Sequence, residues 1–388
     1  MATITRSTNG TRGITPRRFG PSTSNSPLQH IDVVMVLVLG ALSVASIVMV
    51  LAATHGPRTT TNDTYFMIRQ GMFIAIGWGL MAAITAFDYR KLGEWWAAVY
   101  AVAIASLLLV AVVGTEAKGA QRGFELGGFM VQPSEFVKIA VVIALAGYLA
   151  HDPTSRSWSR TLSAVAVVGL PVLLIVLQPD LGTAMVFGAI TLSVLLVAGV
   201  PGKQMLILLV LALLGGAILV TSPVLKDYQR ARLTTFLNPD SADAAEWRYN
   251  TEQSQIAIAN GGLSGQGLLR GGQTANGYVP AQETDFIFTA IGEELGFIGA
   301  SGVSVLYGLL LWRILRAAQL SRDQFGTLVC VGVFAIILFQ VFENVGMTMG
   351  IMPVTGIPLP FMSYGGSSIL MAFAMAGLVM NVHMRRFS

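Results

Sequence analysis

Long apolar runs separated by short polar turns dominate the hydrophobic pattern of this 388-residue chain. A single crossing of a lipid bilayer needs about 20 mostly apolar residues. Several runs approach that length, with ends defined to within a few residues. We therefore predict an all-α polytopic membrane protein with about ten transmembrane helices, over residues 31–53, 66–87, 95–114, 134–151, 161–178, 181–200, 203–221, 285–312, 326–350 and 364–384.

The composition agrees with a membrane protein and excludes other classes. Apolar residues make up 54% of the chain and charged residues only 11%, against roughly 25% charged residues in a soluble domain. These values exclude a soluble enzyme and a disordered protein, and the single cysteine, Cys330, excludes a disulfide scaffold. The net charge of +4 is compatible with nucleic-acid binding. However, the placement of the arginines indicates membrane orientation instead, so we expect no nucleic acid partner.

Basic residues are concentrated on one side of the predicted membrane. An even number of spans puts both termini on the same side, and that side collects most of the Lys and Arg residues. The short loops opposite hold only Arg58, Arg69, Lys118 and Arg122. The positive-inside rule therefore predicts that both termini are cytoplasmic. Residues 1–30 contain four arginines and no acid, which is typical of a disordered basic arm, and residues 31–388 form the transmembrane domain.

The only large polar segment, residues 222–284, joins the seventh and eighth spans and is predicted to be extracytoplasmic. Loops often carry functional residues, so chemistry is expected here. Ser241 is a suitable cap for a helix that stops at Gly261-Gly262. The following stretch, up to Gly272, is too rich in glycine for regular structure and can approach a ligand closely.

Ionisable residues inside a membrane span are costly, so each is a functional candidate. Glu135 and Lys138 are three residues apart at the start of the fourth span and share one helix face. Two interpretations are open: an internal ion pair that locks two helices, or a site where Lys138 holds a phosphate that Glu135 positions. Arg122, in the preceding loop, is close enough in sequence to share an anion site. Arg230 and Arg232, in the long loop, are further candidates.

Asp285 is the sharpest catalytic candidate. It stands in Glu283-Thr-Asp-Phe-Ile-Phe288, where the long outer loop enters the membrane. A half-desolvated carboxylate has a raised pKa and is a better base. The structural alternative, an N-cap of the eighth span, is compatible with that role. Asp180, in a short turn between two spans, is interpreted as an ordinary helix cap.

Three more acids lie within predicted spans. Glu343 and its neighbour Asn344 are expected to make hydrogen bonds between helices. At least one of Glu293 and Glu294 should face the interior of the bundle. No group of residues has metal-ligand spacing, so any metal site is unknown from the pattern alone.

Several motifs occur in an order that closely resembles the RodA/FtsW/SpoVE (SEDS) family of cell-wall polymerases, over residues 31–386. They are Gln132-Pro-Ser-Glu-Phe-Val-Lys138, Gln178-Pro-Asp-Leu-Gly-Thr-Ala184, Thr284-Asp-Phe-Ile-Phe288 with Glu293-Glu-Leu-Gly296, and Pro358-Leu-Pro-Phe-Met-Ser-Tyr-Gly-Gly-Ser-Ser368. Two further segments lean towards the RodA branch, which serves cell elongation. These are Asp227-Tyr-Gln-Arg-Ala-Arg232 and Gln253-Ser-Gln-Ile-Ala-Ile-Ala-Asn-Gly-Gly262.

The resemblance implies a peptidoglycan glycosyltransferase with ten membrane helices in the bacterial cytoplasmic membrane. Its substrate would be lipid II, and its partner a class B penicillin-binding protein that cross-links the strands. Asp285 matches the family's essential catalytic aspartate, Glu135 and Lys138 its polar cluster, and Arg122 its loop arginine. Three positions depart from the family. Gly123 replaces a usual Trp, Ala281 replaces an acid, and Glu283 replaces a basic residue, which makes the surroundings of Asp285 more negative.

The implied reaction joins a sugar C4 hydroxyl to C1 of an α-linked donor and gives a β-1,4 product, so it inverts. Such a displacement needs one general base and no acid like that of a glycosidase, because pyrophosphate is a good leaving group (contrast). Asp285 would accept the hydroxyl proton. Arg122 and Lys138 would stabilise the pyrophosphate. The resemblance also implies a divalent cation, Mg²⁺ or Mn²⁺.

Two other functions remain open. A lipid II flippase would use polar residues at mid-membrane, such as Glu343, but it needs no base at the outer face. A non-catalytic scaffold would recruit the cross-linking enzyme and would tolerate the loss of Asp285.

Overall fold

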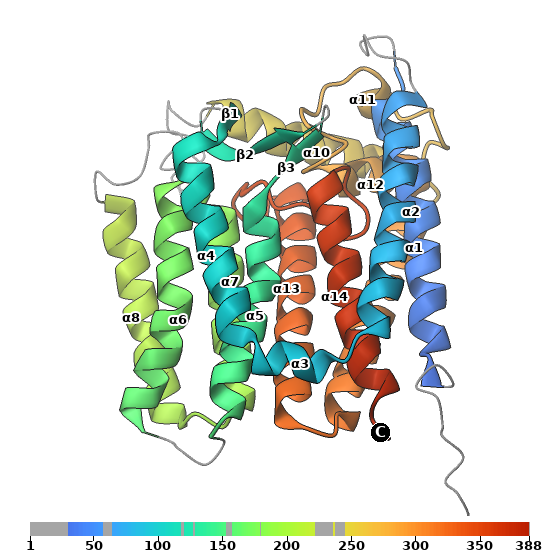
Figure 1. Ribbon diagram of the computed structural model, residues 1–388. Helices are drawn as coiled ribbons and strands as arrows, with labels where there is room; N and C mark the ends of the chain where they lie inside the picture. The colour runs from blue at the N-terminus through green and yellow to red at the C-terminus, as the bar shows by residue number, and fades with distance from the viewer. Residues whose placement is uncertain are drawn as a thin grey trace, which may run out of the picture.

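The computed structural model describes residues 30–56, 64–117, 120–126, 129–152, 157–178, 180–221, 236 and 245–387. These residues form a bundle of helices with a small sheet at one end (Figure 1). The helices are α1 (Val33–Thr54), α2 (Thr64–Ala86), α3 (Tyr89–Glu94), α4 (Trp96–Val113), α5 (Pro133–Ala150), α6 (Trp158–Leu177), α7 (Leu181–Val197), α8 (Gly202–Thr221), α10 (Ala245–Gly261), α11 (Gly272–Ala275), α12 (Ile287–Leu320), α13 (Gln324–Thr348) and α14 (Gly366–Met384).

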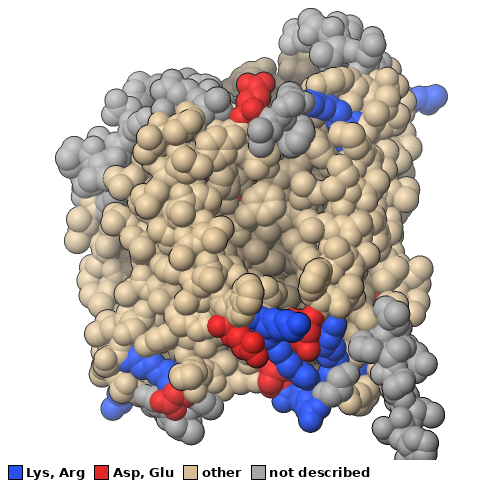
Figure 2. Space-filling view, in the orientation of Figure 1, with Lys and Arg blue, Asp and Glu red and all other residues tan. Residues whose placement is uncertain are grey.

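Each of the ten predicted spans falls on one of these helices. Eight helices of the described chain are long and apolar enough to cross a membrane, and α7 and α8 are shorter apolar helices. The chain is thus a multi-pass membrane protein, as predicted. The eighth span is longer than expected, because α12 continues to Leu320. Figure 2 shows a broad uncharged band between two charged ends of the molecule, the pattern expected around a hydrocarbon core.

Three short strands modify the all-α prediction. They are β1 (Thr115–Ala117), β2 (Ala120–Leu126) and β3 (Phe129–Val131), which lie between α4 and α5 and pair antiparallel in the order β1-β2-β3. The sequence pattern had placed this segment in a loop. Strand β3 leads directly into α5, so the sheet fixes where the first turn of that helix begins.

Helices α5, α13 and α14 are the most enclosed of the candidate spans. Small residues bring them close to their neighbours, as is common in membrane bundles. A Cβ on Gly332 of α13 would lie 2.5 Å from a methyl group of Val142 on α5. A Cβ on Gly77 of α2 would lie 2.4 Å from the ring of Phe373 on α14. These close approaches hold α5 against α13 and α14 against α2.

The two ends of the described chain meet at one face of the bundle. The rings of His30 and Phe387 lie 5.0 Å apart, and Arg313 of α12 binds Asp32, the N-cap of α1, at 2.7 Å. Helices α10 and α11 and the strands lie at the opposite face (Figure 1). That the face with the termini is cytoplasmic stays a prediction. The predicted arm lies outside the described residues except for His30, as do residues 222–235 and 237–244 of the long loop.

Helix α12 is interrupted at Gly296, which has φ 65° and ψ −164°. The break exposes backbone groups that no neighbouring helical turn can bond, and the glycine-rich segment bonds them instead. The N–H groups of Phe297 and Ile298 donate to the carbonyls of Gly262 and Leu263, at 2.9 and 3.1 Å. In return, the N–H groups of residues 266 and 267 donate to the carbonyls of residues 293 and 294, at 3.0 and 3.1 Å. Irregular backbone at membrane depth requires such internal partners.

This contact explains the glycines, because a Cβ on Gly265 would lie 2.0 Å from the Glu294 carbonyl oxygen. The glycine-rich segment therefore approaches α12 closely at Gly265. The carboxylates of Glu293 and Glu294 belong to the same junction. Glu293 accepts from the N–H of Gln273 at 2.7 Å and of Thr274 at 2.9 Å, and Glu294 accepts from the N–H of Leu269 at 3.1 Å. Both carboxylates are buried, so the expectation that at least one faces inward is confirmed.

Candidate functional site

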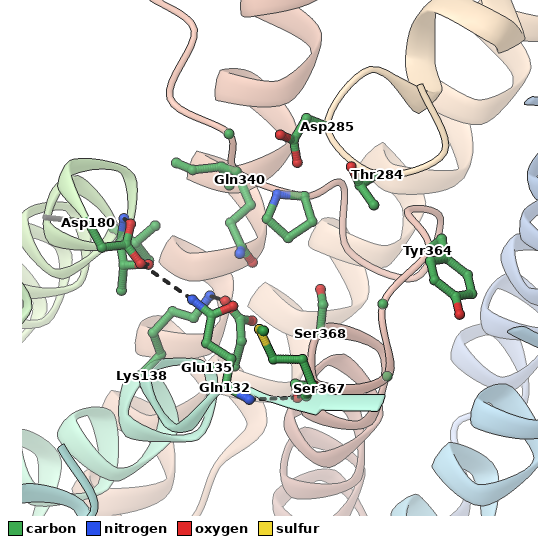
Figure 3. A pocket seen from close by; sticks show the side chains of 18 of the residues that line it. Gln132, Glu135, Lys138, Asp180, Thr284, Asp285, Gln340, Tyr364, Ser367 and Ser368 are labelled. Atoms are coloured by element: carbon green, nitrogen blue, oxygen red, sulfur yellow. Dashed lines mark hydrogen bonds and ion pairs between the residues drawn. The ribbon is translucent and has the colours of Figure 1, made fainter. Parts of the chain in front are cut away.

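The predicted motifs converge on one pocket of about 550 Å³. Its walls come from α5, α7, the turn before α12, the chain between α13 and α14, and the first turn of α14, with single residues from β3 and α13 and two from α2 (Figure 3). Four motifs contribute to it, those within 132–138, 178–184, 284–288 and 358–368. The polar residues that line it are Arg69, Gln132, Glu135, Lys138, Asp180, Thr183, Thr284, Asp285, Gln340, Thr355, Tyr364, Ser367 and Ser368.

A tight turn presents Asp285 to this pocket. The carbonyl of Ala281 accepts hydrogen bonds from the N–H groups of Thr284, Asp285 and Phe286, at 3.2, 3.0 and 3.3 Å. Ala281 has φ 51°, which is uncommon for a residue with a Cβ. Asp285 is half-buried, as predicted. The N-cap of α12 is Phe286, so the expectation that Asp285 caps the eighth span is wrong, and its carboxylate faces the cavity (Figure 3).

Glu135 and Lys138 lie in the first two turns of α5 and form an ion pair. The Lys138 Nζ lies 2.7 Å from Glu135 Oε1, and both side chains are almost fully buried. The pair lies within one helix, so it does not lock two helices together as one interpretation held. An ammonium has three N–H donors, and Glu135 accepts a hydrogen bond from one of them. Both residues line the same pocket as Asp285, so the phosphate interpretation stays a prediction.

Asp180 is the N-cap of α7, as predicted. One carboxylate oxygen accepts from the Thr183 N–H at 3.1 Å and the other from the Thr183 hydroxyl at 2.9 Å. The side-chain amide of Gln132 lies 3.5 Å from the same carboxylate. The capping interaction therefore also ties α7 to the start of α5, at the edge of the pocket.

Three other predicted binding residues are not placed by the structure. Arg122 lies on strand β2, but its side chain is outside the described part of the chain, and Arg230 and Arg232 are outside it altogether.

Gly123, where the family usually has Trp, is next to Arg122, and this departure from the family has a steric reason. A Cβ on Gly123 would lie 2.6 Å from the Val131 carbonyl oxygen and 2.9 Å from Met130, so the Trp usual in the family does not fit this hairpin.

Glu343 and Asn344 make the buried hydrogen bonds expected of them, although to loops rather than to helices. Glu343 accepts from the Thr355 hydroxyl at 2.8 Å. The side-chain amide of Asn344 donates to the carbonyls of Asp285 and Ile357, both at 2.8 Å. Both side chains are fully buried. The pair therefore joins α13 to two segments of the pocket wall.

Arg69 and Tyr364 are pocket residues that the sequence analysis missed. Arg69 was assigned to an outer loop, but α2 begins at Thr64 and carries it. The available signal was a basic residue inside an apolar run. Its guanidinium donates to the Tyr65 hydroxyl at 2.5 Å. Burial raises the pKa of the Tyr364 phenol above its ordinary value, and nearby Arg69 partly offsets this. The phenol therefore stays protonated at neutral pH and can donate a hydrogen bond.

The described residues do not form a metal cage. No group of three His, Cys, Asp or Glu side chains in the described part of the chain could share an ion. Of the carboxylates in the pocket, Glu135 is paired with Lys138 and Asp180 caps α7. The described residues thus offer no cage of three such ligands for a divalent cation, and we assign no step to one.

Comparisons with known proteins give the family. The family model described as "Cell cycle protein", for FtsW, RodA and SpoVE, matches residues 29–387. Over 365 residues the chain is 36% identical to peptidoglycan glycosyltransferase MrdB of Escherichia coli K12, covering 92% of this chain and 94% of that protein.

Two solved structures are also similar. A chain of the structure described as "Structural coordination of polymerization and crosslinking by a peptidoglycan synthase complex" is 32% identical, with a TM-score of 0.78 and coverage of 92% of this chain and 99% of that one. Rod shape determining protein RodA of Thermus thermophilus is 29% identical, with a TM-score of 0.67 and coverage of 92% and 98%. The chain therefore belongs to the FtsW/RodA/SpoVE (SEDS) family, with the likeness to RodA that its sequence indicated.

Proposed function

We propose that this chain is a peptidoglycan glycosyltransferase that polymerises lipid II at the outer face of the cytoplasmic membrane, for cell elongation and shape. The observation that carries the proposal is the pocket itself. It brings a half-buried carboxylate, Asp285, together with two cationic side chains, Lys138 and Arg69, in one cavity near the face opposite the termini. A lipid-linked pyrophosphate sugar needs that combination of groups.

Asp285 is the proposed general base. It takes the proton from the C4 hydroxyl of the acceptor sugar while the oxygen attacks C1 of the donor from the face opposite the pyrophosphate. The C1–O bond to the pyrophosphate breaks in the same step, so the configuration inverts. A positioned base contributes typically 10²–10⁴-fold to the rate. The tight turn at Ala281 supports this role because it holds the backbone of Asp285 at the pocket wall.

Lys138 and Arg69 are proposed to stabilise the departing pyrophosphate. Negative charge grows on the leaving oxygen, and cations already fixed in a cavity shielded from water stabilise it without reorganisation. Glu135 orients the ammonium of Lys138 through their 2.7 Å contact. Arg122, Arg230 and Arg232 are proposed as further contacts to the anionic substrate, from the same outer face. The divalent cation implied by the family resemblance is also a proposal.

We also propose a class B penicillin-binding protein as partner. The structure with a TM-score of 0.78 is described as a complex that coordinates polymerisation and crosslinking. A polymerase that releases uncrosslinked strands at the outer face needs a transpeptidase on the same side of the membrane.

The test is polymerisation of labelled lipid II by the purified protein, alone and with a class B penicillin-binding protein, in Mg²⁺ or Mn²⁺. Asp285→Asn should abolish glycan strands. Asp152→Asn is the matched control, because it removes a carboxylate that is half-exposed and pairs with Arg160 at 3.0 Å, away from the pocket. Strands from wild type and from the control, but not from Asp285→Asn, support the proposal.

Other outcomes separate the alternatives. If no variant makes strands even with the partner present, while lipid II crosses liposome membranes, the protein is a flippase. If Asp285→Asn makes no strands yet keeps partner binding and normal cell shape, the scaffold function is favoured. Strands from Asp285→Asn at the wild-type rate would remove Asp285 from its role and leave the activity in place.

A further inference from the structure

Both peptide groups of Asp285 are held by specific hydrogen bonds. Its N–H donates to the carbonyl of Ala281 at 3.0 Å, within the turn. Its carbonyl accepts from the side-chain amide of Asn344 at 2.8 Å, from α13. The first bond is local, whereas the second spans 59 residues of sequence. The position of Asp285 relative to the rest of the pocket is therefore fixed from α13.

The second bond of Asn344 reaches another pocket wall. Its amide also donates to the carbonyl of Ile357 at 2.8 Å, and Ile357 lines the same cavity as Asp285. Two carbonyls within hydrogen-bond distance of one nitrogen settle the orientation of the amide, since only its NH₂ group can donate to both. Asn344 itself is fully buried and does not line the cavity. It therefore acts on the pocket only through the two backbone segments that it joins.

A third hydrogen bond completes this arrangement. The N–H of Tyr364 donates to the carbonyl of Glu283 at 2.8 Å. The turn that carries Asp285 is thus attached at one side to the segment before α14 and at the other to α13. Of these attachments, only that of Asn344 is made by a side chain, so it alone can be removed by a substitution that leaves the backbone chemistry unchanged.

We infer that Asn344 is a positioning residue for the reaction, which fixes the Asp285 backbone against the opposite wall of the pocket. The inference rests on the proposed role of Asp285 as general base. Rates of proton transfer depend steeply on geometry, and a misplacement of about 1 Å can cost 10²-fold. Removing Asn344 leaves the cavity lining and all of its charged side chains in place. It should therefore lower kcat and leave the KM for lipid II nearly unchanged.

The chain contains a matched control at its other face. Asn381, on α14, is also buried, and its side-chain amide donates to two backbone carbonyls, those of Ile84, at 2.7 Å, and Phe87. Its removal also leaves two carbonyls without this donor, far from the pocket, and in addition removes an acceptor of the Arg385 guanidinium. Asn344→Ala and Asn381→Ala should both lower the thermal midpoint of the purified protein. If Asn344 has only a structural role, the two variants should lower activity equally, just as both lower the thermal midpoint.

The experiment measures lipid II polymerisation by wild type, Asp285→Asn, Asn344→Ala and Asn381→Ala, below the lowest thermal midpoint. We expect Asn344→Ala to lower kcat about 10- to 100-fold, with KM within twofold, and Asn381→Ala to keep kcat within twofold. Equal losses in both Asn variants, or an unchanged kcat in Asn344→Ala, would overturn the inference. If Asn344→Ala does not fold, Asn344→Asp takes its place, because its volume is nearly the same and its protonated form donates to only one carbonyl. Asp285→Asn separates the two proposals. If it is active, the base assignment fails. If it is inactive while Asn344→Ala keeps the wild-type kcat, the positioning inference alone fails.

Discussion

Replacing Lys138 with methionine removes one partner of a buried ion pair. In the folded protein Lys138 is 1% exposed and Glu135 is 6% exposed, and their charged atoms lie 2.7 Å apart. Lys138→Met leaves the Glu135 carboxylate buried without its cation. Breaking a buried pair in this way costs about 3–5 kcal/mol of stability. We therefore expect a large fall in the thermal midpoint of the detergent-purified protein, measured by intrinsic fluorescence.

The double variant Lys138→Met/Glu135→Leu separates stability from chemistry. Replacing a whole buried pair by apolar residues of similar volume is often neutral or stabilising, so most of the lost stability should return. Activity should not return, because the pocket then lacks the cation that we propose for the pyrophosphate. The assay is strand formation from labelled lipid II, with both variants held below their thermal midpoints.

Two results would refute this reasoning. A double variant with wild-type polymerisation would show that the pair only supports the fold and that Lys138 does not contact the leaving group. A single Lys138→Met variant as stable as wild type would show that the Glu135 carboxylate does not depend on its partner. In that case, the burial of the pair would not indicate how much the pair contributes to the stability of the fold.

Three further predictions follow from the described geometry. Gly265→Ala should prevent stable folding, since its Cβ would lie 2.0 Å from the Glu294 carbonyl oxygen. Gly262→Ala is the control: its Cβ meets open space, so the variant should lose only about 1–2 kcal/mol of stability for the positive φ. Equal thermal midpoints of the two variants would contradict this prediction. Gly123→Trp should destabilise the hairpin, because its Cβ meets the Val131 carbonyl at 2.6 Å, and a thermal midpoint like that of wild type would refute the clash. Chelation by EDTA should stop strand formation until Mg²⁺ or Mn²⁺ is restored, and equal rates with and without the chelator would remove the cation from the proposal.

Hydropathy alone predicted the ten spans, because the length of an apolar run in a membrane protein is set by bilayer thickness. It could not predict the strands before α5, whose residues have no long alternating pattern. It also missed the break in α12. The residues on both sides of Gly296 continue one predicted span, and the break depends on backbone partners from residues 262–267.

The residues of the site also fall into those that the sequence predicts and those that it does not. Residues in recognisable motifs, such as Asp285 and Lys138, were found because their chemistry and order are distinctive. Arg69 was missed because it was counted with the outer loops, although it falls within the predicted span 66–87 and a basic side chain in an apolar run is itself a signal. The attachment of Asp285 by Asn344 could not be found at all, since a contact across 59 residues leaves no local pattern.

The break in α12 divides this span between lipid and protein surroundings. Residues 297–312, which precede Arg313, form an uncharged run of about 24 Å at 1.5 Å per residue, most of the hydrocarbon thickness of roughly 30 Å. Phe297 and Ile298 are 66% and 67% exposed, so the lipid-facing part of the helix begins right after the break. The first half carries Glu293 and Glu294, whose carboxylates accept hydrogen bonds from the backbone of residues 269, 273 and 274. These acids therefore face protein instead of lipid, which lets a membrane helix carry two adjacent carboxylates.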